Sequence, residues 1–175
     1  MASNIQGFKS SFKYDPAKAS RFDVRIVPPA NLPFIGVNAR DLVYKCQTAE
    51  LPGRALATTE QKTYGPVEKY PYMTMFNDID LTFIIEDDMR QKVFFDEWLN
   101  YITPLSTNNY RYKSDYCCDI IISQYDMSDV LSYSVKLIES YPLSVNQLSL
   151  DWSSDDYHRL MVTFAYTRWE PNRNY

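Results

Sequence analysis

The sequence predicts a mainly β domain with one flanking helix, and three observations support this fold class. Tyrosine and phenylalanine are abundant, with fifteen and nine copies, whereas glycine occurs only four times in 175 residues. Aromatic side chains suit the pleated, half-buried surface of a strand. Short stretches also alternate apolar with polar side chains, which is the period of a strand buried on one face. We count about seven or eight such strands and one stretch with helical spacing.

Residues 1–20 are expected to form an arm outside the domain. Phe8 and Phe12 alternate there with polar residues, among them three lysines, and no period is sustained. We predict a segment that is disordered in the free monomer; the alternative is an arm that docks on a partner after assembly. The N-terminus has no apolar run of the length of a secretory signal, and no segment approaches the roughly 20 apolar residues of a membrane span. We therefore expect a soluble protein.

The predicted domain spans residues 21–170 and begins with two strands. In the first, apolar residues alternate with polar ones from Arg21 until Pro28 ends the run. The second strand is predicted over Asp41–Thr48, and its expected inward face consists of Leu42, Tyr44 and Cys46.

Residues 49–77 are predicted to form a long loop. Pro52-Gly53 and Gly65-Pro66 punctuate this segment, and no cluster of charges marks it as a disordered linker. Connections of this length inside a compact domain are usually functional or disordered. Apolar residues scattered through the segment favour docking on another surface, and they are Leu56, Val67, Tyr70, Tyr72 and Met75.

Ile79–Glu86 has the clearest strand pattern, and a helix is predicted after it. The expected inward face of the strand consists of Ile79, Leu81, Phe83 and Ile85. Asp87 or Asp88 is expected to cap a helix over residues 88–103, which ends before Pro104. Its apolar residues recur at helical spacing, and they are Phe94, Phe95, Trp98, Leu99 and Ile102.

Four more strands are predicted in the second half of the chain, over Asp119–Tyr125, Val130–Glu139, Leu143–Trp152 and Leu160–Trp169. Turns rich in Asp and Ser are expected at residues 126–129 and 153–156, and residues 171–175 form a tail. Nothing before Pro171 blocks the edge of the last strand, and open edges pair with other chains. We infer that copies of the chain join edge to edge into a closed ring.

No catalytic, cofactor-binding or metal-binding residues are predicted. His158 is the only histidine and has no ligand spacing to a cysteine, so a structural surface role is expected rather than a metal site or a Cys–His pair. Cys46, Cys117 and Cys118 are an odd set, which argues against a disulfide framework and for a reducing compartment. Paired carboxylates such as Asp87-Asp88 lie at element boundaries, where caps and turns explain them.

The charge balance argues against a general affinity for nucleic acid. The net charge is −4, and phosphate binding needs a positive field. Tyr110–Tyr116 nevertheless interleaves aromatic with basic residues, as single-strand binders do. The rim of a protein interface has the same composition. A small β-barrel nucleic-acid-binding module that uses this segment is the competing hypothesis from another functional class.

Several segments occur in a characteristic order between Arg21 and Glu170. They are Arg21–Ile26, Cys46–Pro52, Phe95–Trp98, Tyr141–Val145, Leu148–Trp152, and Met161–Tyr166 with the following Trp169-Glu170. In this order they resemble the tail tube protein of T-even-like contractile-tailed bacteriophages.

The resemblance implies a β-barrel-like sandwich with one flanking helix, six copies per ring, and rings stacked into a tube through which DNA passes without specific binding. The implied partners are further copies, a tail sheath protein, a tape-measure protein and baseplate tube-initiator proteins. No cofactor, membrane or enzymatic activity is implied, and the expected location is the virion after assembly in the host cytoplasm. Related alternatives are a baseplate tube-initiator paralogue and a type VI secretion tube protein.

The resemblance also assigns the loop of residues 49–77 to contacts between subunits. The candidate contact residues are Leu51, Pro52, Gly53, Leu56, Val67, Tyr70 and Tyr72. Asp80 and Glu86 are candidate lumen-facing acids, because negative charge repels DNA and keeps it mobile. The alternative for both is an outer, solvated face. The predicted core includes Leu150, Trp152, Val162, Phe164 and Tyr166.

Overall fold

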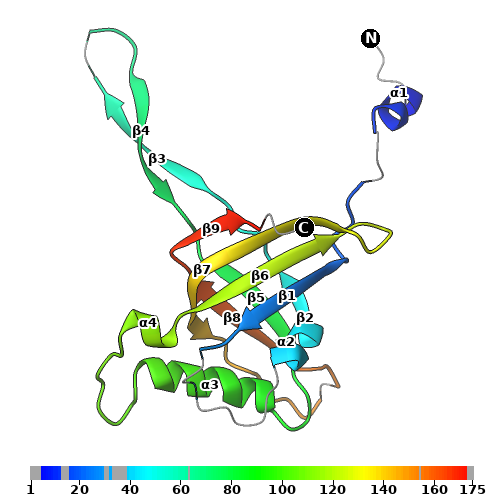
Figure 1. Cartoon of the computed structure of the whole chain (residues 1–175), viewed down its shortest axis with the longest axis vertical. Coiled ribbons are helices and arrows are strands. Elements are labelled where there is room, and N and C mark those ends of the chain that lie inside the picture. Colours follow the sequence, from blue (N-terminus) through cyan, green and yellow to red (C-terminus); the bar gives the residue numbers. More distant parts are fainter. Residues whose placement is uncertain are drawn as a thin grey trace.

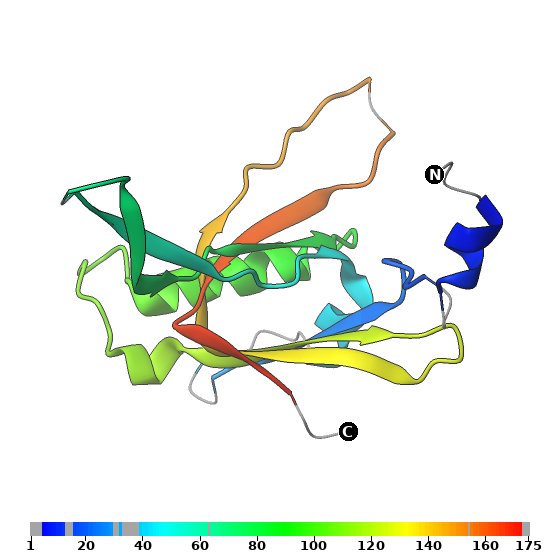
Figure 2. The same cartoon turned by 90° about the horizontal axis from the view of Figure 1, so that it is seen from above.

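The computed structural model describes residues 5–12, 16–29, 32, 39–62, 64–153 and 155–172 of the chain. Two layers of antiparallel strands pack face to face and share one long strand, as the view from above shows (Figure 2). The first layer runs β1 (Phe22–Val27), β6 (Cys118–Tyr125), β7 (Leu131–Val145) and β9 (Arg168–Pro171). The second layer runs β7, β8 (Arg159–Ala165), β5 (Ile79–Ile84) and β2 (Cys46–Ala49). The predicted mainly β class with one flanking helix is confirmed.

The strand β7 belongs to both layers because it turns a corner at Glu139. Its first part pairs with β6 and β9, and its last part, from Tyr141 onward, pairs with β8. Glu139 has a φ of 56°, a left-handed conformation that is uncommon for residues other than glycine. The sequence predicts two strands here, and the structure instead has one continuous strand that ends at Val145.

The core lies between the two layers, where apolar side chains of both meet. The first layer contributes Val24, Ile26, Ile120, Ile122, Val135 and Leu137. The second contributes Ile79, Leu81, Phe83, Leu160, Val162 and Phe164. These residues recur at every second position, so the alternation that predicts the strands also identifies the buried face. Burying each such side chain contributes about 1.5–3 kcal/mol.

The helix α3 (Arg90–Ile102) closes one end of the sandwich, and the sequence predicts it correctly apart from its first residues. Phe94, Phe95 and Trp98 are buried, and the Trp98 ring lies 6.2 Å from that of Phe164 on β8. The N-cap is Met89, which has a φ of 54° and makes no side-chain capping bond. Asp88 still satisfies a helix-end amide, because its Oδ1 accepts a hydrogen bond of 3.2 Å from Arg90 N.

The prediction of a strand over Asp41–Thr48 is wrong for its first half. Residues Ala39–Lys45 form the helix α2, and β2 begins only at Cys46. Leu42 is buried whereas Tyr44 is 86% exposed, so the two do not share an inward face. Leu42 and Cys46 stand four residues apart, a spacing that fits one face of a helix as well as one face of a strand.

The remaining elements differ from prediction in their connections. Residues 146–158 contain no strand among those described, and Leu150 and Trp152 are exposed rather than in the core. The run predicted as Leu160–Trp169 divides into β8 and β9 around Tyr166-Thr167, where the chain crosses between the layers. The core prediction holds for Val162 and Phe164, and Tyr166 is half-buried against the core. Two short helices complete the described chain, α1 (Ile5–Ser10) and α4 (Lys113–Tyr116).

Candidate self-assembly surface

The segment predicted as a long loop is a β-hairpin that projects from the sandwich (Figure 1). Its strands β3 (Ala55–Gln61) and β4 (Glu68–Met75) pair with each other in a separate two-stranded sheet. An irregularity in register between Ala57 and Thr58 accommodates Pro71 opposite Thr58. The prediction of a long loop over residues 49–77 is therefore wrong for Ala55–Gln61 and Glu68–Met75, which form strands.

The hairpin exposes apolar side chains along its length. Residues that pair directly share a face, which places Tyr70, Met73 and Met75 together beside Ala57. These three side chains are 44–49% exposed, and Tyr64 near the tip is fully exposed. An isolated two-stranded hairpin is marginally stable in water. Burial against another surface would stabilise the hairpin and cover its apolar residues.

The predicted contact residues divide between the hairpin and its base. Leu56, Val67, Tyr70 and Tyr72 lie on the exposed hairpin, as a contact surface requires. Leu51, Pro52 and Gly53 lie where the hairpin leaves the sandwich, and there the Gly53 carbonyl accepts a hydrogen bond of 3.1 Å from Trp169 Nε1. That bond fixes the base of the hairpin to β9.

The two candidate lumen acids lie in different surroundings. Asp80 stands on β5, and its Oδ1 accepts a hydrogen bond of 2.6 Å from Thr163 Oγ1 on β8. Glu86 lies beyond the end of β5, and its Oε2 is 2.5 Å from Lys45 Nζ. Hydrogen bonding to the Lys45 ammonium holds the pKa of Glu86 below its ordinary value. The structure thus places both acids on the second layer or next to it, without bringing them together.

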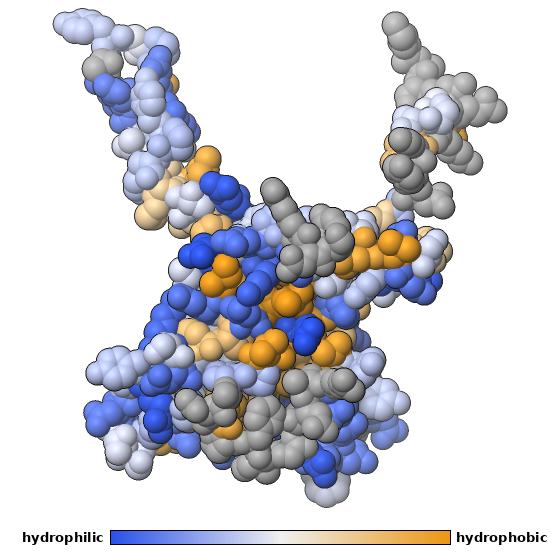
Figure 3. Space-filling model, in the orientation of Figure 1, coloured by the Kyte–Doolittle hydropathy of each residue, from blue (hydrophilic) through white to orange (hydrophobic). Residues whose placement is uncertain are grey.

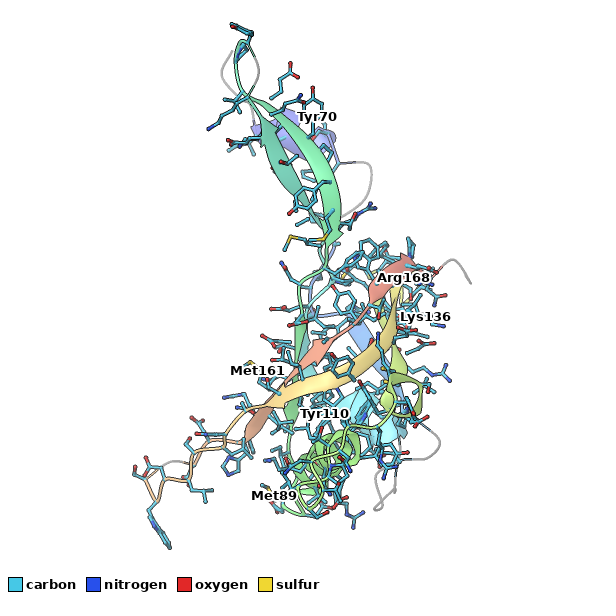
Figure 4. The ribbon with its side chains drawn as sticks, turned by 90° about the vertical axis from the view of Figure 1, so that its left-hand side faces the viewer. Tyr70, Met89, Tyr110, Lys136, Met161 and Arg168 are labelled. Carbon is cyan, nitrogen blue, oxygen red and sulfur yellow. The ribbon has the colours of Figure 1, made fainter. Side chains whose placement is uncertain are left out.

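The first layer has two open edges, β1 and β9; the sequence indicates an unblocked edge only for the last strand, whose end is β9. Among the described strands, β1 pairs only with β6 and β9 pairs only with β7. The register places four residues in one row across the outward face of this layer: Arg25, Ile121, Lys136 and Glu170. Figure 4 shows Lys136 and Arg168 together on this side, with Met161 of the second layer on the other. Placing β1 and β9 at opposite edges of one layer requires the strand order, which local periodicity does not contain.

The outward face of the first layer mixes apolar with charged side chains, as the space-filling view shows (Figure 3). Val27 on β1 is 48% exposed there. Lys136 forms an ion pair of 2.7 Å with Asp119, and Arg168 forms one of 3.0 Å with Glu170. The charges of Lys136 and Arg168 on this outward face are therefore balanced by acidic residues of the same chain.

The basic residues of the Tyr110–Tyr116 segment already have partners within the chain. Arg111 Nε donates a hydrogen bond of 2.9 Å to the Tyr101 carbonyl, and its guanidinium carbon lies 4.3 Å from the Tyr101 ring centroid. Lys113 Nζ lies 2.7 Å from Glu139 Oε2. Tyr110 is exposed, but a phosphate-binding surface also needs available cations.

The described residues give little support for catalysis or metal binding. They include no group of three His, Cys, Asp or Glu that could hold a metal ion. Burial raises the pKa of the Cys46 thiol to about 12 and that of Cys117 to about 11, so neither is an activated nucleophile. Within the same part of the chain, no helix is long and apolar enough to cross a membrane.

A small sandwich with open sheet edges and a projecting apolar hairpin defines a class of protein, the self-associating structural subunit. The sequence model of the family described as phage tail tube protein matches residues 17–172. The chain belongs to the phage tail tube protein family, and its role is structural rather than enzymatic.

Solved structures of contractile injection systems share the fold. One chain of the anti-feeding prophage baseplate, determined with six-fold symmetrisation, has a TM-score of 0.66 at 15% identity, over 90% of this chain and 96% of that one. A chain of the PVC sheath–tube complex in its extended state has a TM-score of 0.63 at 17% identity, over 94% and 95%. A chain of the PVC sheath/tube terminator gives 0.65 at 17%, over 91% and 99%. Among curated protein sequences, none matches this chain.

Proposed function

We propose that six copies of this chain form a ring, that the rings stack into the inner tube of a contractile phage tail, and that the genome passes through the tube during ejection. Family membership supports the tube, and the shared fold with subunits of a six-fold baseplate and of a sheath–tube complex supports a contractile system. The proposed partners are a sheath protein outside, a tape-measure protein inside and initiator proteins at the baseplate. The proposed location is the virion, after assembly in the host cytoplasm.

The proposed ring is supported mainly by the directions of the two edge strands, β1 and β9. Strands β1, β6, β7 and β9 alternate in direction, so β1 and β9 run antiparallel to each other at opposite edges of one layer. A second copy placed edge to edge would therefore continue an antiparallel sheet without a reversal. Such pairing satisfies the backbone groups that an open edge leaves unpaired, and repeated around an axis it closes a ring.

Either the outward face of the first layer or the side of the second layer with Asp80 and Glu86 could line the lumen of the proposed tube. If β1 of one copy pairs with β9 of the next, the first layer forms the continuous wall, and its outward face with Arg25, Lys136 and Glu170 is the natural lining. The proposal that Asp80 and Glu86 face the lumen instead requires the second layer to point inward. Replacing both acids by lysine in an infectious phage separates the two, since slower ejection is expected only if these acids line the channel.

Electron microscopy of the purified protein tests the main proposal. Six copies of a 20.5 kDa chain weigh about 123 kDa, which native mass spectrometry resolves from a monomer or a trimer. Rings at low concentration and tubes at high concentration are expected, while dispersed monomers under all conditions would contradict the proposal.

A baseplate tube initiator is the second candidate, because one similar subunit comes from a baseplate. An initiator would form single rings that do not stack with one another. Tube growth from the purified protein alone therefore distinguishes the two roles.

A further inference from the structure

Two segments of opposite charge, far apart in the sequence, are mostly exposed at the residues that the structure describes. One is the N-terminal arm, residues 5–20, which begins with α1. The other, called here the acidic loop, is the connection of residues 146–158 between β7 and β8. Figure 1 shows α1 above the sandwich and the acidic loop at the lower end.

The charges of the two segments are complementary. Residues 1–20 carry three lysines and one aspartate, whereas the whole chain has a net charge of −4. The acidic loop carries three aspartates and no lysine or arginine. The Asp151 carboxylate accepts hydrogen bonds from Ser153 N at 3.0 Å and Ser153 Oγ at 2.8 Å, which hold its pKa below the ordinary value. The acidic loop therefore carries negative charge at neutral pH, whereas the arm carries net positive charge although the whole chain is acidic.

Both segments also expose large apolar side chains that the chain itself leaves uncovered. Phe8 and Phe12 pack edge to face with ring centroids 5.0 Å apart, and they are 63% and 47% exposed. In the acidic loop, Leu150 is 86% exposed, and Trp152 is fully exposed. Exposed apolar surface marks an interaction site where it is contiguous, as in the Phe8–Phe12 pair.

The acidic loop is held open rather than collapsed on the sandwich. At one end, Asn146 N donates to the Met161 carbonyl at 3.0 Å, and Met161 N donates to Asn146 Oδ1 at 2.8 Å. At the other end, the His158 carbonyl accepts a hydrogen bond of 3.2 Å from Ile85 N. The loop frames a cavity of about 550 Å³ lined by residues including Leu148, Trp152 and Tyr157. This volume lies within the range of about 300–1,000 Å³ that is typical of ligand pockets.

We propose that the arm of one copy docks on the acidic loop of a copy in the adjacent ring, with Phe8 and Phe12 in the cavity and the arm lysines beside the loop aspartates. The six residues of α1 span about 9 Å, and ten further residues can span at most about 33 Å, so the arm can reach at most roughly 40 Å. A folded domain of this length is also roughly 40 Å across. The arm can therefore reach the far end of a neighbouring copy. This inference rests on the proposed stacking of rings.

Charge reversal tests the contact in the full-length protein. One variant reverses the arm (Lys9→Glu with Lys13→Glu), and another reverses the loop (Asp151→Lys with Asp155→Lys). Each is expected to form rings but to need at least about tenfold higher concentration to stack them, because like charges now face each other at every ring junction. Negative-stain microscopy counts rings and tubes, and sedimentation measures the stacked fraction.

Mixing the two variants shows whether the contact joins different copies. In an equal mixture, each reversed arm finds a reversed loop and each native arm finds a native loop, so tubes are expected to return. Combining both reversals in one chain is expected to restore tubes as well. Asp96→Lys with Glu97→Lys on α3 is the control, because it changes the net charge as the loop variant does and is expected to leave stacking unchanged.

The outcomes separate this inference from the proposed function. Wild-type protein that forms no rings would overturn the proposed function. Wild-type tubes combined with normal stacking of both reversed variants would overturn the arm contact alone. Loss of rings in the arm variant would place the contact within a ring, and failure of the mixture to form tubes would show that the arm and the loop are not partners. Either result overturns the inference.

Discussion

Lys113 and Glu139 form an ion pair, with 2.7 Å between Lys113 Nζ and Glu139 Oε2, at the corner where β7 passes from one layer to the other. The Thr167 hydroxyl donates a hydrogen bond of 2.8 Å to the same carboxylate oxygen. Thr167 lies in the crossing from β8 to β9, so this one carboxylate joins three parts of the chain. Glu139 reaches them from a left-handed backbone conformation.

The pair at Glu139 predicts a specific loss of stability in acid. Its hydrogen bonds from Lys113 and Thr167 lower the pKa of Glu139 in the folded state. A lowered pKa stabilises the fold above the unfolded value of about 4.3, and this contribution disappears as the pH falls through the folded value. Wild-type protein should therefore lose more thermal stability between about pH 5 and pH 3 than Glu139→Gln does, as measured by circular dichroism.

Lys113, the partner of Glu139, predicts a loss of stability at alkaline rather than acid pH. Hydrogen bonding to Glu139 raises the pKa of Lys113, so its contribution is present below the ordinary lysine value and is lost as the pH rises through the folded value. Lys113→Met should remove that alkaline loss, as melting temperatures measured by circular dichroism can show.

If the melting temperatures of wild type and Glu139→Gln fall by the same amount between about pH 5 and pH 3, the ion pair does not contribute to stability.

Trp98 and Trp152 predict opposite outcomes for the same substitution. Trp98 is fully buried, and its Nε1 donates a hydrogen bond of 3.0 Å to the Tyr116 carbonyl. Trp98→Ala should lower the free energy of unfolding by about 3–5 kcal/mol. Trp152→Ala should change it by less than about 0.5 kcal/mol, because that side chain is fully exposed. Urea unfolding of the disassembled protein measures both, and comparable losses would contradict the placement of Trp152.

The elements that sequence patterns predict well are those that bury one face in the core. The spacing of Phe94, Phe95, Trp98 and Ile102 identifies α3, because all four side chains pack on the sandwich. The alternation of Ile79, Leu81 and Phe83 identifies β5 for the same reason. Hydrophobic periodicity records burial, so it is reliable where burial is one-sided.

The elements that sequence patterns miss lack such burial. The hairpin exposes residues on both faces, and its register is interrupted opposite Pro71, so no period of two is sustained. Leu148, Leu150 and Trp152 do alternate with polar residues, yet β8 begins only at Arg159 and leaves them no strand to pair with. Aromatic abundance still indicates an assembly surface, and the unblocked last strand indicates one open edge. The position of β1 at the opposite edge of the same layer emerges only from the complete strand order.

The three thiols should react slowly and in a fixed order. Burial raises the pKa of Cys117 to about 11, that of Cys46 to about 12, and that of Cys118 further still. At pH 8 a thiol of pKa 11 is about 0.1% thiolate, against roughly a quarter for an ordinary cysteine. N-ethylmaleimide should therefore label Cys117 slowly and Cys118 only on unfolding, as intact-mass spectrometry can follow. Cys117→Ser is the control, and rapid labelling at all three sites would contradict the burial.

The hairpin predicts a loss of assembly without a loss of folding. Tyr70→Ser with Met73→Ser removes two side chains that are about half exposed in the single chain, so monomer stability should change by less than about 0.5 kcal/mol. Assembly should weaken markedly, because those side chains would be buried between copies. Val93→Ser on α3, at 41% exposure, is the matched control. Intact assembly of the hairpin variant in sedimentation would remove the hairpin from the interface.

Arg25 and Glu170 predict the seam of the ring. They occupy the same row at opposite edges of the first layer, separated by three strand spacings of about 4.8 Å, so they cannot pair within one chain. A copy added edge to edge in the same register brings Arg25 of one subunit beside Glu170 of the next. Arg25→Glu should disfavour ring closure by about 0.2–1 kcal/mol at each seam, which six seams multiply.

Combining Arg25→Glu with Glu170→Arg should restore rings, because the charges across the seam become complementary again. Arg168 is only 3.0 Å from Glu170 in the wild-type chain, and Lys136 is the register partner of Glu170, so the combined variant also needs Arg168→Gln and Lys136→Gln to avoid adjacent like charges. Arg168→Gln with Lys136→Gln, without the two reversals, is the control. Native mass spectrometry reports the hexamer fraction at a fixed concentration. A combined variant that assembles no better than Arg25→Glu would show that β1 and β9 meet in another register or not at all.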